Sequence, residues 1–70
     1  MNTFEELYSA IDNPDVTVFW KQENYVAARD KFGRANVTCT GNGHIAGLYE
    51  PDYPPEDFYI AEINPTNRGI

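Results

Sequence analysis

The hydrophobic and polar positions of the first dozen residues predict a helix at 3–12. Its apolar residues recur at the i, i+3, i+4 and i+7 spacing of one helical face: Phe4, Leu7, Tyr8 and Ile11. Thr3 and Glu6 have the spacing of a capping box, in which each side chain accepts a hydrogen bond from the other residue's backbone N–H. Asn13 and Pro14 should end the helix, because the residue before a proline disfavours the helical backbone region.

Four later segments have the patterns typical of β-strands. The first is an unbroken run of β-branched and aromatic residues, and the last follows a proline-rich stretch. The predicted strands are 15–21, 36–40, 44–49 and 58–63. Gly41-Asn42-Gly43 separates the second strand from the third, and Asn-Gly at such a position is a strong hairpin signal because both residues accept positive φ.

Residues 24–32 fit two different elements. Asn24 could cap a helix at its start and Gly33 could close it, and these capping signals favour a second short helix. The alternative is a strand that pairs with residues 16–20. The inward residues of that strand would be Val26, Ala28 and Phe32.

Together these elements predict an α+β fold, in which the N-terminal helix packs on a small, mainly antiparallel sheet of three to five strands. Seventy residues allow one domain, which we place at 1–64 and expect to be followed by a flexible C-terminal tail at 65–70. A chain of this size buries only about 60% of its unfolded surface, so its stability should be a few kcal/mol.

The distribution of charge is more informative than the net charge of −6. Residues 1–20 contain four acidic and no basic side chains, residues 21–34 carry a local charge of +2, and residues 35–67 carry −5. Such a negative field repels nucleic acid and favours basic partners. The chain shows no secretory signal pattern and no apolar run long enough for a membrane span. With one cysteine and no signal, we expect a complete, small, cytoplasmic protein.

The stretch 49–59 consists only of aromatic, acidic and proline residues. Its three prolines fix φ and remove backbone donors, so we predict a stiff, partly polyproline-like loop in place of a helix or an interior strand. Such a loop would hold rings and carboxylates outward at a low entropic cost. We expect at least one of Tyr49 and Phe58 to pack on the sheet. Tyr53 should be the free ring, and its bond to Pro54 is a candidate cis peptide.

The sequence offers little for catalysis or metal binding. Its one cysteine, Cys39, and its one histidine, His44, lie five residues apart across the predicted hairpin. No third orienting group or oxyanion hole is recognisable near them, so we interpret Cys39 as a packed residue and His44 as a strand-edge residue. A zinc site needs about four ligands, and the acidic loop lacks the spacing and central glycine of an EF-hand. We therefore predict no enzyme, no metal and no cofactor.

A basic and aromatic segment at 20–34 provides an alternative function. Its residues could bind single-stranded nucleic acid by stacking and phosphate contacts: Trp20, Tyr25, Lys31 and Arg34. The pI of about 4.4 argues against this and favours bases that pair with the chain's own carboxylates. Two further alternatives are a structural subunit of an assembly and a homodimer formed through Phe19 or Trp20, left uncovered by a thin sheet.

The acidic loop leads to the main functional prediction. We expect a protein that occupies the basic, nucleic-acid-binding surface of a target protein, as a DNA mimic does, and so inhibits or modulates that target. Its size, charge and single domain are comparable in kind to small acidic phage proteins of the anti-CRISPR, anti-restriction or nuclease-inhibitor type, although no motif specifies this. We expect no direct nucleic-acid or membrane contact. The predicted partner-binding residues are Tyr49, Glu50, Asp52, Tyr53, Glu56, Asp57, Tyr59 and Glu62.

Overall fold

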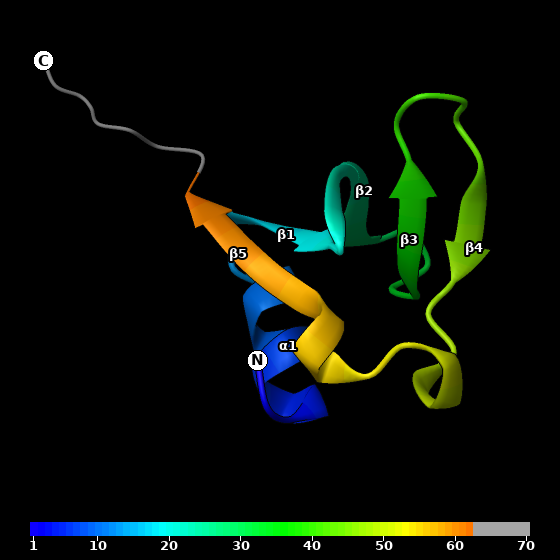
Figure 1. The fold of residues 1–70 in the computed structure, drawn as a ribbon. Helices are drawn as coiled ribbons and strands as arrows, with labels where there is room; N and C mark the ends of the chain where they lie inside the picture. The colour runs from blue at the N-terminus through cyan, green and yellow to red at the C-terminus, as the bar shows by residue number, and fades with distance from the viewer. Residues whose placement is uncertain (63–70) are drawn as a thin grey trace, which may run out of the picture.

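A computed structural model describes residues 1–62 and consists of one α-helix packed on one face of a five-stranded antiparallel sheet (Figure 1). The strand order is β4-β3-β2-β1-β5, so the first four strands form a meander and the last strand returns to pair with the first. The elements are α1 (Phe4–Ile11), β1 (Val16–Trp20), β2 (Gln22–Arg29), β3 (Ala35–Cys39), β4 (Ile45–Gly47) and β5 (Phe58–Glu62). The predicted α+β fold is confirmed. The predicted tail at 65–70 lies outside the described residues.

Helix α1 forms as its sequence pattern predicts. The Thr3 hydroxyl accepts the Glu6 N–H at 3.1 Å, and the Glu6 carboxylate accepts the backbone N–H of Thr3 at 3.1 Å and of Asn2 at 2.8 Å. The capping box is therefore complete, and its hydrogen bonds, that from Asn2 first, lower the pKa of Glu6. Leu7 and Ala10 are the buried residues of the helix, which ends at Asp12.

The prediction of a second helix at 24–32 is wrong, because these residues belong mostly to strand β2. This strand is central in the sheet and forms backbone hydrogen bonds with β1 on one side and β3 on the other. Two ladders satisfy more of its backbone than one short helix could, and this tertiary pairing overrides the capping signals at Asn24 and Gly33. Gly33, at φ 82°, instead forms the turn between β2 and β3.

The inward face proposed for the strand alternative is also wrong. Ala27 is buried, opposite Val18 of β1 and Val37 of β3, whereas Ala28 is exposed and Phe32 is 70% exposed in the turn. The register changes between Phe19 and Trp20, where β2 carries extra residues in a bulge. On the core side of this irregularity, Val18 pairs with Ala27 and Phe19 with Val26; directly paired residues share a face, so the buried Val18 places Ala27 inward and Val26 outward.

Two tight turns depend on residues with positive φ. Lys21 connects β1 to β2 at φ 63°, the only non-glycine residue among 1–62 in this region of backbone space. In the confirmed hairpin between β3 and β4, Gly43 has positive φ, at 75°, and Asn42 does not. The Gly43 N–H donates to the Cys39 carbonyl at 2.8 Å and closes a loop wider than a two-residue turn.

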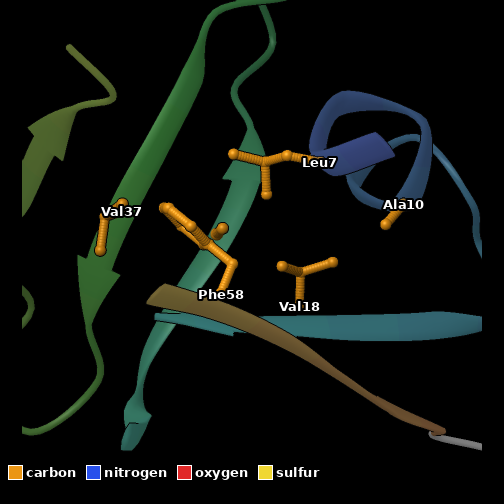
Figure 2. Close-up of a cluster of buried hydrophobic side chains, with 6 residues drawn as sticks. Leu7, Ala10, Val18, Val37 and Phe58 are labelled. Carbon is orange, nitrogen blue, oxygen red and sulfur yellow. The ribbon is translucent and has the colours of Figure 1, made fainter. Parts of the chain in front are cut away.

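The core lies between α1 and the sheet face that it covers (Figure 2). Phe58 is 2% exposed and lies between Val18 and Val37, with Leu7 pointing toward it from the helix. Six buried residues make up this core: Leu7, Ala10, Val18, Ala27, Val37 and Phe58. We call this side of the sheet the inner face. The opposite side, the outer face, has no layer packed on it among residues 1–62.

The proline-rich stretch is the connection from β4 to β5, which lie at opposite edges of the sheet. Four strand spacings of about 4.8 Å separate these edges, so the connection must travel roughly 19 Å. It passes the inner face, where Leu48 and Tyr53 pack against the core and Pro55 is buried. The loop is thus part of the folded body, and this determines which of its rings can be free.

Candidate acidic partner-binding surface

Two single turns of 3₁₀-helix give the acidic loop a defined shape. They span Glu50–Asp52 and Pro55–Asp57, each with a proline in its first positions. The Tyr53 N–H donates to the Glu50 carbonyl at 3.1 Å, and the Asp57 N–H donates to the Pro54 carbonyl at 3.0 Å. Proline cannot continue a ladder but suits the start of such a turn. Every peptide bond of residues 1–62 is trans, so the cis bond proposed between Tyr53 and Pro54 is wrong.

The carboxylates of this loop have no basic partner within the described residues. The one ion pair there joins Arg29 to Asp12, with the Arg29 Nε 2.6 Å from the Asp12 carboxylate. The loop acids are Glu50, Asp52, Glu56 and Asp57; Asp57 is half-buried and the other three are exposed. We define these four residues as the acidic surface. Its charges are held on fixed turns and are not neutralised by contacts inside the described chain.

Tyr8 connects the acidic surface to helix α1. Its hydroxyl donates to the Glu50 carboxylate at 2.8 Å, across 42 residues of sequence. Burial, and then this hydrogen bond and the negative charge of Glu50, raise the pKa of Tyr8. Sequence analysis placed Tyr8 only on the apolar face of the helix and missed this contact. No sequence signal pointed to it, because a single long-range hydrogen bond leaves no periodic pattern.

The structure brings together only part of the predicted partner-binding set. Tyr49 is 64% exposed and precedes the first turn, so it lies beside the acidic surface. Tyr53, predicted to be free, is half-buried against Trp20 and the buried Phe58, with ring centroids 5.1 and 6.3 Å away. The prediction for Tyr53 is wrong, because the loop crosses the inner face at this residue. The prediction that at least one of Tyr49 and Phe58 packs on the sheet is confirmed by Phe58.

The last two predicted residues lie in strand β5. The Tyr59 ring is 40% exposed and lies 5.6 Å from the Phe19 ring on the outer face. Glu62 ends the strand opposite Val16 of β1. Tyr59 therefore faces away from the side on which the loop packs, and one partner surface would not readily contact both Tyr59 and the acidic surface.

The basic residues of segment 20–34 do not form one surface with its rings. Trp20 and Tyr25 pack against the core, with their rings 5.3 Å apart, whereas Lys31 and Arg34 flank the exposed Phe32 in the turn after β2. The Arg29 side chain is occupied by contacts within the chain. It binds Asp12, donates to the Gly33 carbonyl at 2.8 Å and lies over the Tyr8 ring.

A groove of about 670 Å³ lies between the turn after β2 and the segment after β4. Arg34 and Tyr49 are among its lining residues, together with Asp30. The Asp30 carboxylate accepts hydrogen bonds from the backbone of Arg34, the Asn36 amide and the backbone of Phe32, and these lower its pKa. The groove therefore carries charges of both signs, and the Asp30 carboxylate is already hydrogen-bonded within the turn after β2.

Cys39 and His44 line one small cavity of about 200 Å³, together with the rings of Trp20, Tyr25 and Tyr53. Cys39 is half-buried at the end of β3 and lies outside the buried core, and His44 is exposed just before β4. The Trp20 Nε1 is buried and has no hydrogen-bond acceptor among the described residues. Within residues 1–62, no three His, Cys, Asp or Glu side chains cluster as a metal site would require.

Comparison with protein-family models, curated proteins and solved structures finds no match for this chain. Among the described residues, no helix combines the length and the apolar character that crossing a membrane would need.

Proposed function

We propose that the protein is a non-enzymatic, cytoplasmic binding protein that presses its acidic surface against a basic, nucleic-acid-binding surface of a target protein. Binding would block or modulate that target, as small acidic phage-encoded inhibitors of host defence nucleases do. The observation that carries this proposal is the set of four carboxylates on two fixed turns, none of which has a basic partner within residues 1–62.

Fixed turns favour binding because little conformational entropy remains to be lost on association. Negative charge that is not neutralised internally is available for long-range attraction to a basic surface and speeds the encounter. The exposed Tyr49 next to Glu50 adds a ring of the kind that contributes strongly at interfaces. The proposal places the contact on Tyr49 and the acidic surface, with Tyr8 as the residue that positions Glu50.

The test compares two variants with the same change in net charge. The loop variant carries Asp52→Asn, Glu56→Gln and Asp57→Asn and keeps Glu50, whose carboxylate accepts the Tyr8 hydroxyl. The control variant carries three matched changes at exposed acids elsewhere: Glu5→Gln, Asp15→Asn and Glu23→Gln.

Tagged wild-type protein first captures its partner from nuclease-treated host lysate, and titration calorimetry with the purified partner then measures affinity. We expect the loop variant to bind about tenfold or more weakly and the control to bind nearly as wild type, with affinity falling as salt rises. Equal affinities of the two variants would refute a role for the acidic surface. A capture that disappears after nuclease treatment would instead favour nucleic-acid binding through Lys31, Phe32 and Arg34.

A further inference from the structure

On the outer face of the sheet, side chains form two parallel rows that cross the strands. One row of directly paired residues crosses all five strands: Ile45, Thr38, Val26, Phe19 and Tyr59. Two residues further along each strand lies a parallel row: Gly47, Asn36, Ala28, Thr17 and Ala61. Its side chains are smaller than those of the first row on every strand except β3, where Asn36 and Thr38 are similar in size. We call the first row the ridge and the second row the trough. Residues two apart on a strand share a face, so the rows run about 7 Å apart.

The two rows themselves contain no formally charged side chain. Neither row contains an Asp, Glu, Lys, Arg or His residue, although 23% of the chain is charged. Ile45 is 61% exposed and Tyr59 is 40% exposed, on the two edge strands, and Ala28 is exposed in the trough on the central strand β2. A hollow of about 300 Å³ opens there between Ala28, Asn36, Thr38 and Ile45, and it is also lined by Arg29 and Asp30.

We propose that the outer face is the interface of a two-fold symmetric dimer of this chain. A two-fold axis parallel to the rows and midway between them places each ridge over the trough of the other copy. In that arrangement each strand except β3 pairs its own large residue with its own small one, so Ile45 covers Gly47 of the second copy and Val26 covers Ala28. Alternation of large and small side chains is how facing sheets interdigitate, and a two-fold interface must be complementary to itself.

Charge favours a second copy over a different partner at this face. A basic or acidic protein would find no opposite charge in either row, whereas two copies, each with a net charge of −6, can pack row against row with no charged side chain between the rows. Arg29 and Asp30 lie at the edge of this contact, where they line the hollow. The planar footprint is about 400 Å² per copy, from five strands about 4.8 Å apart and about 17 Å long. Both copies together bury roughly 800 Å² or somewhat more, which is below the standard interface size and predicts a weak, reversible dimer.

Gly47 provides the sharpest test of this packing. A Cβ atom added at Gly47 would come no closer than 4.0 Å to its nearest neighbour, the Asn36 side-chain oxygen, and the residue has no positive φ. Gly47→Val should therefore be accepted by the isolated chain, since a β-branched residue suits a strand. In the dimer it would fill the place that Ile45 of the other copy occupies.

The matched pair for a charge test is Ile45→Lys and Ile60→Lys. Both isoleucines are exposed on edge strands, at 61% and 47%, but Ile60 is paired with Val18 and so belongs to the inner face. Lysine at position 45 would place a charge in the interface, while lysine at position 60 would not.

Sedimentation equilibrium from about 10 µM to about 1 mM would measure dimerisation, with circular dichroism as the check on folding. We expect a wild-type dimer that strengthens with salt, because screening reduces repulsion between two acidic copies, the opposite of the salt effect on the acidic surface. Gly47→Val and Ile45→Lys should weaken the dimer by about tenfold or more, and Ile60→Lys should leave it unchanged. In a mixture of isotope-labelled and unlabelled chains, NOEs should connect Val26 methyls to Ala28 of the other copy.

A wild-type chain that stays monomeric at about 1 mM in moderate salt would overturn the proposal. So would an equal loss of dimer in the variants at positions 45 and 60, or a folded Gly47→Val variant that dimerises as wild type. None of these results depends on the acidic surface, so the two proposals can fail separately.

Discussion

Replacing Tyr53 with alanine should lower the free energy of unfolding by about 2–3 kcal/mol. The ring lies on the inner face, 5.1 Å from the Trp20 ring and 6.3 Å from the Phe58 ring. A tyrosine side chain offers roughly 200 Å², and withdrawing about two thirds of it from water contributes about 3 kcal/mol at about 25 cal/mol/Å². Alanine retains a small part of this. A domain of this length has only about 4–10 kcal/mol of stability in total, so the loss should be large.

Urea unfolding followed by far-ultraviolet circular dichroism would measure the effect. The midpoint should fall by about 1–2 M for Tyr53→Ala. The control is Tyr49→Ala in the same loop, where the ring is 64% exposed and the change should stay within about 0.5 kcal/mol of wild type. Tyr53→Phe keeps the ring and should lie close to wild type. Equal stability of the Tyr53→Ala and Tyr49→Ala variants would show that the loop does not cross the inner face as described.

Three further perturbations test local features of the fold. Thr3→Ala removes the N-cap oxygen of α1 and should lower the free energy of unfolding by about 1 kcal/mol, measured by thermal or urea unfolding. Thr3→Ser keeps a hydroxyl and should be as stable as wild type. An alanine variant as stable as wild type would mean that the capping box contributes nothing. Lys21→Val should be less stable than Lys21→Gly by about 1 kcal/mol or more, because a β-branched residue fits φ 63° poorly. Equal urea midpoints of the two variants would contradict a positive φ at residue 21. Asp30 has a lowered pKa, so its contribution to stability is present above its ordinary pKa of 3.8 and is lost as pH falls through its lower folded-state pKa. In Asp30→Asn, the free energy of unfolding should therefore fall less steeply with decreasing pH in the acidic range. A fall as steep as that of wild type would refute this role of the Asp30 carboxylate.

Strands β1, β3, β4 and β5 and the capping of α1 could be predicted because each depends on residues close together in the chain. The Thr3 and Glu6 reciprocal bonds and the turn at Gly43 are decided within a few residues, so their signals survive without tertiary context. The acidic composition of residues 49–59 likewise predicted where negative charge would concentrate. That part of the candidate surface could be found from the sequence alone.

The state of residues 24–32 could not be decided in the same way. Their local capping signals at Asn24 and Gly33 are real, but a central strand gains backbone partners on both sides, and neither partner strand is visible in the local pattern. The register of β2, which pairs Ala27 with Val18 on one side and with Val37 on the other, then set which residues face inward. Ala27 at the centre of the core therefore followed from the pairing of three strands.

The sequence by itself determined an acidic α+β chain with a capped helix, a Gly43 hairpin and a stiff loop rich in carboxylates. Only the tertiary structure decided that β4 and β5 lie at opposite edges of the sheet, which forces the loop across the inner face and buries Tyr53 beside Trp20. The physical reason is that strand order and register depend on contacts between distant segments. Composition can say which side chains a chain carries, but only these contacts place the ridge and the trough side by side on one face.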